Sequence, residues 1–488
     1  MSNSIYLRDR LYLAIDQGGH ASRALVFNVQ GEVVCQAHCD IHARQPAPGF
    51  VEYDAEALLH SIETLVQDIA AQLGERRRHV YAAGLATQRS NCLCWHRQTG
   101  AALTPIISWQ DTRNADWLVG LQAERDDIHK RSGLFLSPHY GASKIRWCLD
   151  HVPEVQAAQQ QGQLVYGPMA AYLAQRLTGQ VARADAVNAS RTQLVNLDSG
   201  QWDPALLELF GLDARCLPEC VPNQARFGQL RLDGHVVDLN CVTGDQSAAL
   251  FSYGRLQPDT AYVNIGTGAF VSRPSGYAKR YNRRLLTSVI HQFDNHDCLY
   301  ALEGTINGAG SALQWLIEEE GIADLFTHLP QWLNDETAPP LFLNGVSGLA
   351  APFWQGQFTS EFIGAANSAQ KAVAVVESIV FLINSNIEEM QKTASPPQQI
   401  QVTGGLGRLE GLCQRLADVT ALPVYRPEEC EATARGLAYL LAGQPAPWPE
   451  ASPGQWFEPA ANPTLRARYT AWLDTLQQRL RQPATASL

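Results

Sequence analysis

The chain has 488 residues, and its 37 Lys and Arg against 48 Asp and Glu give a formal net charge of −11. Hydrophobic residues make up 45% of it and charged residues 17%, a balance that excludes an intrinsically disordered chain. The acidic charge lacks the basic footprint that nucleic-acid binding requires, so we expect no such partner. The length allows about three domains, or two large ones.

No segment is expected to cross or bind a membrane. The most apolar run, residues 375–383, contains Glu377 and is too short to span a bilayer. The first ten residues lack the apolar core of a secretory signal. The eleven cysteines form no Cys-x-x-Cys motif, and an odd count without an export signal favours reduced thiols and a cytoplasmic location. Zinc near Cys216 and Cys220 is disfavoured, because no second ligand pair has matching spacing.

The first predicted elements form a hairpin around a glycine turn. A strand at residues 11–15 is followed by Gly18 and Gly19, and then by a returning strand at residues 23–29. The next predicted elements are a strand at 33–38, a helix at 55–73 and a strand at 81–86. Strands that alternate with helices indicate an α/β core.

A second set of elements repeats this pattern. It consists of a strand end at 241–243, a helix that begins near Asp245, a strand at 261–265, the turn Gly266-Thr267-Gly268 and a strand at 269–273. A third glycine turn, at residues 404–405, separates a strand at 399–403 from a helix at 409–419. The repeat predicts two related α/β halves that join between residues 248 and 260.

The C-terminal residues are predicted to form a loop and a final helix. Residues 444–462 are rich in Pro, Gly and Ala, which is typical of loops. Residues 464–480 carry Tyr469, Trp472 and Leu476 at helical spacing. We expect this helix to pack on the second half.

The first glycine turn has the composition of a phosphate-binding loop. Gly18 and Gly19 lack side chains, so backbone N–H groups there can approach phosphate oxygens closely. Asp16 at the strand end is suited to Mg²⁺, which takes one or two carboxylates and several waters. Arg23 can neutralise charge on a transferred phosphoryl group. A glycine hairpin beside an Asp can equally be an ordinary turn, but the turn at Gly266 repeats it.

Asp245 stands where a strand is predicted to meet a helix N-terminus. The helix dipole there favours the ionised carboxylate, which can accept the proton of an attacking hydroxyl. Phosphoryl transfer needs only a weak, well-placed base, because its transition state is loose. A helix-capping Asp without chemistry is the alternative.

Ten segments in order resemble the FGGY carbohydrate kinases, which belong to the sugar kinase, Hsp70 and actin superfamily, and within them the glycerol kinases most. The resemblance covers residues 11–443. The segments are AIDQG with SRALVF (14–27), TQR (87–89), WQDTR (109–113), NASRT (188–192), TGDQSAALF (243–251), GTG (266–268), LEGTINGAGSALQWL (302–316), SGLAAPFW (347–354), GGLGRLEGLCQRLAD (404–418) and EATARGLAYLLAG (431–443).

The resemblance implies a fold, a reaction and a set of roles. The fold would be two actin-like, ribonuclease H-like domains, residues 1–253 and 254–445, around a central cleft, followed by the tail 446–488. ATP and Mg²⁺ would be the cofactors, and a homodimer or homotetramer is expected. The matching positions are Asp245 as base; Arg89, Ser90, Trp109, His139 and Gln246 at the substrate; Asp16 at the metal; Gly18, Gly19, His20, Arg23, Gly266 and Thr267 at the phosphates; and Gly310, Gln314 and Gly405 around the ribose and adenine.

Several positions depart from the glycerol kinase pattern. Gly19, His20 and Ala21 replace Thr, Thr and Ser, which removes two hydroxyl donors; His20 is either a partial substitute or a surface residue. Leu409 stands where those kinases have an Asn near adenine.

The substrate positions depart as well: Ser90 replaces a Glu, and His139 replaces a Tyr. A charge-assisted hydrogen bond is worth ~1.5–3 kcal/mol, so the lost Glu disfavours glycerol by ten- to a hundredfold. The smaller Ser90 leaves room for a longer polyol or a sugar.

We therefore predict an ATP-dependent kinase that acts on a small polyol or sugar. Glycerol kinase proper is one alternative, with Ser90 and His139 compensating for the lost contacts. A non-catalytic regulator that binds nucleotide and sugar on the same fold is a second alternative. The altered first loop and Leu409 favour it, whereas retention of Asp16, Arg23 and Asp245 counts against it. An actin-like structural ATPase is disfavoured, because the segments around Arg89 and Trp109 would then have no purpose.

Overall fold

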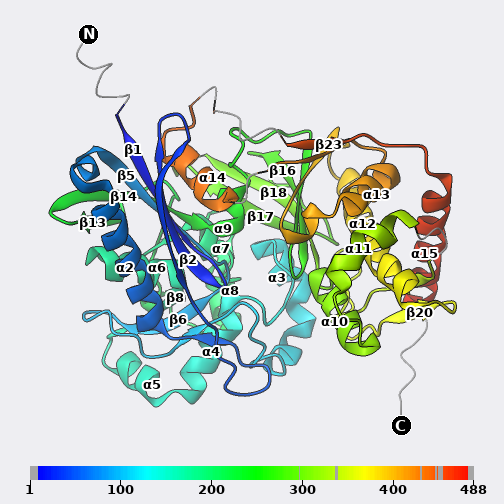
Figure 1. Cartoon of the computed structure of the whole chain (residues 1–488). Coiled ribbons are helices and arrows are strands. Elements are labelled where there is room, and N and C mark those ends of the chain that lie inside the picture. The colour runs from blue at the N-terminus through cyan, green and yellow to red at the C-terminus, as the bar shows by residue number, and fades with distance from the viewer. Residues whose placement is uncertain are drawn as a thin grey trace. The chain divides into compact units, whose positions relative to one another are not determined.

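The computed structural model describes residues 9–295, 297–335, 339–428, 431–445, 448 and 454–481. The chain has a two-domain α/β fold with two mixed sheets, as the sequence predicts (Figure 1). Its compact units are unit 1, made of Met1–Leu256, Ser288–Tyr300 and Glu431–Glu450, and unit 2, made of Gln257–Thr287, Ala301–Cys430 and Ala451–Leu488. The domain limits expected from the sequence, 1–253 and 254–445, stay a prediction.

Unit 1 is built on a six-stranded sheet of order β13-β14-β5-β1-β2-β3. Its strands are β1 (Leu11–Gln17), β2 (Ala21–Asn28), β3 (Val33–Asp40), β5 (Val80–Thr87), β13 (Gly228–Leu232) and β14 (His235–Gly244). β1 and β2 form the predicted antiparallel hairpin, while β5 runs parallel to both β1 and β14. The strands predicted in this region are therefore confirmed.

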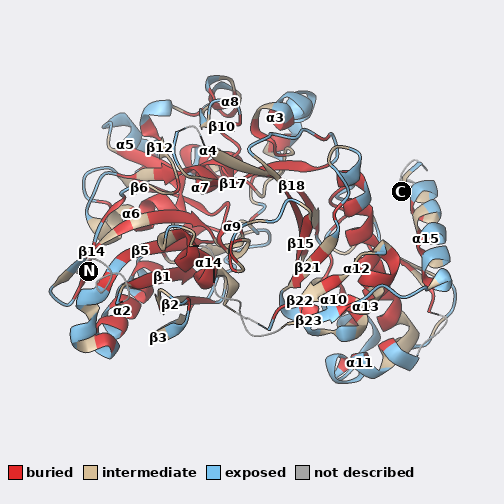
Figure 2. Cartoon of the chain, turned by 90° about the horizontal axis from the view of Figure 1, so that it is seen from above, coloured by how far each residue is buried: buried red, intermediate tan, exposed pale blue. Residues whose placement is uncertain are grey.

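Helices cover both faces of this sheet. On one face, α2 (Ala55–Leu73) packs against β2 and β3, and α6 (Met169–Thr178) against β5 and β13. On the other face lies α14 (Ala432–Leu441), which contacts β1, β5 and α9 (Asp245–Ala249). A Cβ on Gly84 of β5 would lie 2.8 Å from Cδ1 of Leu437, so a glycine lets α14 lie this close. β1 and β5 are thus buried, as Figure 2 shows in red.

Smaller elements complete unit 1. A second sheet has the order β4-β7-β6-β8, with β4 (Glu52–Tyr53), β6 (Cys92–His96), β7 (Ile106–Ile107) and β8 (Leu164–Pro168). The remaining helices are α3 (Arg125–Ser132), α4 (Gly141–His151), α5 (Pro153–Gln160), α7 (Ala186–Ser190) and α8 (Pro204–Phe210). Two-stranded pairs join β9 (Arg183–Asp185) to β12 (Glu219–Val221) and β10 (Val195–Asn196) to β11 (Gln201–Trp202).

Unit 2 contains the strands of the second large sheet around β15 (Thr260–Ile265). The sheet order is β17-β18-β16-β15-β21-β22-β23, and Ser288–Tyr300, the outer part of the β17–β18 hairpin, is grouped with unit 1. The other strands are β16 (Ala269–Gly276), β17 (Leu286–Gln292), β18 (Cys298–Ile306), β21 (Gln399–Thr403), β22 (Val424–Arg426) and β23 (Gln455–Phe457). The predicted glycine turn between β15 and β16 and the strand at 399–403 are confirmed.

The helices of unit 2 surround the buried α12 (Ser368–Gln391). They are α10 (Gly310–Glu320), α11 (Leu325–Asp335), α13 (Glu410–Thr420) and α15 (Pro463–Arg481), and a short hairpin joins β19 (Leu341–Leu343) to β20 (Glu361–Ile363). The predicted last helix is confirmed as α15, which buries Trp472 and Leu476 and donates from Trp472 Nε1 to the Phe342 carbonyl at 2.8 Å.

One prediction is wrong. Residues 444–462 are not all loop, because β23 lies within them. β23 pairs antiparallel with β22, and the rings of Trp456 and Tyr425 lie 4.9 Å apart between their centres. The strand depends on this partner strand rather than on its own composition.

The ten cysteines within the described residues are all free, as expected. In the same residues no cluster of three or more His, Cys, Asp and Glu could hold a metal. Among the helices that the structure describes, none is both long and apolar enough to span a bilayer.

Candidate active site

The unit 1 site lies where three neighbouring parallel strands end. Gln17 of β1 and Gly244 of β14 are both paired with Thr87 of β5. Carboxyl ends of parallel strands meet at one edge of a sheet, where ligands of α/β proteins bind. This register brings the predicted residues Asp16, Arg89 and Asp245 to the same edge. Gly244 permits the approach, since a Cβ there would lie 2.5 Å from the Arg89 Cγ.

Asp245 begins α9 and is linked to the neighbouring substrate candidates. Its Oδ1 accepts from the Gln246 backbone N–H at 2.7 Å, and the Gln246 side-chain oxygen accepts from the Arg89 guanidinium. Burial raises the pKa of Asp245, while the charges of Arg89 and Arg191 and the Gln246 N–H act to lower it. A buried carboxylate beside cations and a helix start is chemically suited to accept a proton.

The substrate candidates Ser90, Trp109 and His139 lie together in unit 1. The rings of Trp109 and His139 lie 5.3 Å apart between centres, and the Trp109 backbone N–H donates to Asn91 Oδ1 at 2.8 Å. Burial and the charges of Lys144, Arg191 and Arg89 hold the pKa of His139 well below its usual range, so its ring is neutral. Ser90 has a left-handed backbone (φ 66°), and its buried Oγ has no hydrogen-bond partner among the described residues.

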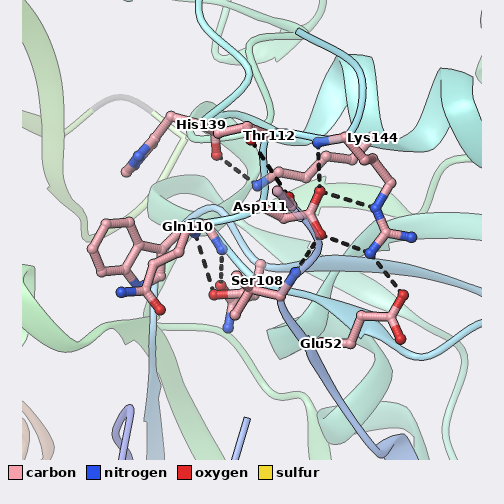
Figure 3. Close-up of polar contacts among 12 residues, drawn as sticks. Glu52, Ser108, Gln110, Asp111, Thr112, His139 and Lys144 are labelled. Atoms are coloured by element: carbon pink, nitrogen blue, oxygen red, sulfur yellow. Dashed lines mark hydrogen bonds and ion pairs between the residues drawn. The ribbon is translucent and has the colours of Figure 1, made fainter. Parts of the chain in front are cut away.

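The loop around Trp109 is anchored by an ion network. Asp111 is fully buried and accepts from the Val51 backbone N–H and from the Arg113 guanidinium, each at 2.7 Å. Arg113 also donates to Glu52 at 2.7 Å, and Figure 3 shows Asp111 and Glu52 in this network. The hydrogen bonds that Asp111 accepts in the described structure hold the loop in place, which supports a structural role.

Asp16 is a buried carboxylate with one uncommitted oxygen. Its Oδ2 lies 4.0 Å from Arg23 Nη1, and Arg23 Nε lies 3.9 Å from Glu431 Oε2. Oδ1 is buried and has no hydrogen-bond partner in the part of the chain that the structure describes. A carboxylate oxygen without a donor fits a metal ligand, so the residues present are compatible with Mg²⁺ at Asp16.

Burial raises the pKa of Asp16 to about 7, and the Asp245 and Glu431 charges add to the increase while Arg23 opposes it. In the unfolded chain the same carboxyl has a pKa of about 4. The raised pKa in the folded protein therefore adds its full contribution to the stability of the folded state below that pH, and this contribution is lost as pH rises through about 7. We therefore expect the melting temperature of the ligand-free wild type, minus that of Asp16→Asn, to fall between pH 4 and 7 and to be constant above it. Thermal unfolding across that range measures it, and a difference that rises with pH would contradict the raised pKa.

Side chains from other elements fix the first glycine loop. The Gly18 carbonyl accepts from Gln17 Nε2 at 2.6 Å and Gln88 Nε2 at 2.9 Å, and the Gly19 carbonyl accepts from the Tyr53 hydroxyl at 3.1 Å. Gly18 N–H closes the turn onto Ala21 O at 3.0 Å. His20 is exposed. In the described structure the N–H groups of Gly19 and His20 have no acceptor, as a phosphate-binding loop requires.

The nucleotide candidates of unit 2 line a cavity of about 770 Å³. Five of its lining residues were predicted: Gly266, Thr267, Gly310, Gln314 and Gly405. Gly310 N–H donates to Gly266 O at 2.9 Å, which ties the glycine turn to the start of α10. A Cβ on Gly310 would lie 2.7 Å from that oxygen, so only glycine fits. Leu409, at the adenine-side position of the resemblance, lines the same cavity.

The sequence did not single out Gln88, Tyr53, Glu431 or Lys144. Gln88 and Glu431 lie in two of the ten resembling segments, and the order of those segments was the only signal for them. Tyr53 and Lys144 act through contacts between residues far apart in the chain.

Comparisons with known proteins agree with this arrangement. The model for the FGGY family of carbohydrate kinases, N-terminal domain, matches residues 11–249, and the model for its C-terminal domain matches residues 261–444. A glycerol kinase of Ectopseudomonas mendocina is 33% identical, covering 96% of this chain and 98% of that protein. One of Synechocystis sp. is 34% identical, covering 88% and 89%.

Solved structures share the fold. A Plasmodium falciparum glycerol kinase with ADP has a TM-score of 0.87 at 23% identity, covering 97% of this chain and 99% of that chain. A xylulose kinase from Rhodospirillum rubrum has a TM-score of 0.85 at 20% identity, covering 97% and 100%.

Proposed function

Because the chain belongs to the FGGY family of carbohydrate kinases, we propose that it transfers the γ-phosphoryl group of ATP to a hydroxyl of a small polyol or sugar longer than glycerol. The observation that carries the proposal is the group of buried polar side chains beside Asp245. There Arg89 and Gln246 stand next to the carboxylate, and the buried Ser90 Oγ has no partner among the described residues. A buried hydroxyl without a partner among the described residues suits a substrate hydroxyl that glycerol is too short to supply.

Each residue has a role in this reaction. Arg89 and Gln246 donate to the substrate and orient one hydroxyl toward Asp245, and Trp109 and His139 form a wall against its carbon chain. Asp245 accepts the proton of that hydroxyl as it attacks the γ-phosphorus. Burial keeps the carboxylate pKa closer to neutral than that of a free Asp, which makes it a better base at physiological pH.

The remaining residues bind the nucleotide. The N–H groups of Gly19 and His20 and the Arg23 side chain hold phosphate oxygens, while the cavity lined by Gly310, Gln314 and Gly405 takes the ribose and adenine. Asp16 would hold Mg²⁺, which when bound neutralises charge on the phosphates. Asp16 must then be ionised, and a bound cation lowers its pKa from the value in the empty site.

Glycerol itself is the second candidate, because the curated relatives at 33% and 34% identity are named glycerol kinases. A panel of glycerol, erythritol, arabinitol, xylulose and ribulose, with ATP consumption as the readout, separates the two. We expect kcat/KM to be at least about tenfold higher for a four- or five-carbon compound than for glycerol. A clear preference for glycerol would favour the second candidate. Binding without turnover on any compound would favour the non-catalytic regulator.

A further inference from the structure

Lys144 is a buried cation that the proposed reaction does not use. It lies in the first turn of α4 and is only 1% exposed, whereas lysine is almost never fully buried unless it is paired. Its Nζ donates to the His139 carbonyl at 2.8 Å and to the Ser90 carbonyl at 3.4 Å. Figure 3 shows Lys144 and His139 side by side. The ammonium therefore donates hydrogen bonds to two backbone oxygens.

The charged neighbours of Lys144 are committed elsewhere. Asp111 influences it electrostatically, but both Asp111 oxygens accept from Arg113. In the part of the chain that the structure describes, no carboxylate lies within ion-pair distance of Nζ. Burial lowers the pKa of Lys144 to about 8, so the ammonium is charged at neutral pH despite its position. Burying this charge away from water is unfavourable unless the ammonium is hydrogen-bonded, as it is here to two carbonyl oxygens.

The two carbonyls belong to the two substrate-pocket positions that depart from the glycerol kinase pattern. Ser90 follows β5, and His139 precedes α4, so neither backbone is held by a shared strand or helix. Ser90 also has a left-handed backbone, and although its carbonyl accepts from Lys144, its Oγ has no hydrogen-bond partner among the described residues. One side chain thus joins two loops that are 49 residues apart in the sequence.

We propose that Lys144 is a positioning residue that sets the spacing between Ser90 and His139, and through that spacing the fit of the pocket to its polyol or sugar. The inference rests on the proposed function, because the pocket role of these two residues is part of it. Lys144 does not touch the reacting atoms. Its loss therefore changes how well the substrate is held more than how fast the bound substrate reacts.

The test is Lys144→Met, which keeps the length of the side chain and removes its donors. On the best substrate of the wild type, we expect KM to rise at least about tenfold while kcat changes less than about threefold. Lys144→Arg keeps the charge and the donors and should recover most of the KM. The matched control is Lys371→Met in unit 2, which loses a 2.6 Å ion pair with Glu320 and should leave KM unchanged.

A merely structural role predicts a different outcome. It would lower the melting temperature and the active fraction, and hence kcat, while KM stays at the wild-type value; that result would overturn the inference. If Lys144→Met does not fold, Lys144→Gln replaces it, because its shorter amide cannot reach both carbonyls and should raise KM. An unchanged KM in Lys144→Gln likewise overturns it. If the wild type phosphorylates none of the compounds, the proposed function itself fails, and this result is distinguishable from a failure of the inference about Lys144.

Discussion

Replacing Asp245 with Asn is expected to lower kcat by about 10²–10⁴-fold, because the amide cannot accept the proton of the attacking hydroxyl. The substitution keeps the size of the side chain and the acceptor for the Gln246 N–H, so the start of α9 should persist. ATP binding should change less than about threefold, since Asp245 is not among the residues proposed to hold the phosphates, the ribose or the adenine. Single-turnover phosphoryl transfer and nucleotide-induced thermal shift measure the two effects separately.

Asp233→Asn is the matched control. Its side chain is 76% exposed, and its backbone φ of 42° is one that Asn tolerates as well as Asp. It should leave both turnover and nucleotide binding unchanged. Normal turnover by Asp245→Asn would show that another group, or none, accepts the proton. Loss of nucleotide binding in that variant would instead indicate a structural role for the carboxylate.

The substitution Ser90→Glu is expected to raise kcat/KM for glycerol by about 10–100-fold, the value of one charge-assisted hydrogen bond to a substrate hydroxyl. The new carboxylate would stand next to Arg89, whose charge favours its ionised form. It would also fill the space that a longer substrate uses, so kcat/KM for the best four- or five-carbon compound should fall by a similar factor. Steady-state kinetics on both compounds gives the ratio directly.

Ser90→Gln separates charge from size in this experiment. Gln has the same length as Glu but no charge, so it should reduce the activity on the longer substrate without an equal gain for glycerol. Equal kinetics for the Glu and Gln variants would show that position 90 acts by volume alone. No change in either variant would remove Ser90 from the pocket.

Local patterns predicted much of the fold. Helix α2 has the predicted bounds, because its apolar residues repeat at helical spacing and Asp54 caps its N-terminus by accepting from the Ala57 N–H. The two glycine hairpins were predicted for the same reason, because each is formed by residues that are close together in the sequence. Strand β23 was missed, because three residues in a segment rich in Pro and Gly become a strand only beside β22, about 30 positions earlier.

The residues of the site also divide into those that the sequence predicts and those that it does not. The order of the resembling segments was enough to propose Asp16, Arg89 and Asp245, and the register of β1, β5 and β14 explains why they meet. Lys144 could not be found in this way. A lysine in the first turn of a helix is usually solvated, and only the packing of loops distant in the sequence buries it. Tyr53 and Gln88 hold the first loop through contacts of the same kind.

The place of α14 in the chain also bears on how the protein is made. The helix belongs to unit 1, where Leu437 is fully buried and Arg435 donates to the Gly31 carbonyl at 2.9 Å. Yet it begins at residue 432, whereas β1 ends at residue 17. The N-terminal sheet therefore leaves the ribosome long before the helix that covers one of its faces. During that interval the apolar face of β1 and β5 is open to chaperones and to aggregation, and fragments that end near residue 256 should share this weakness.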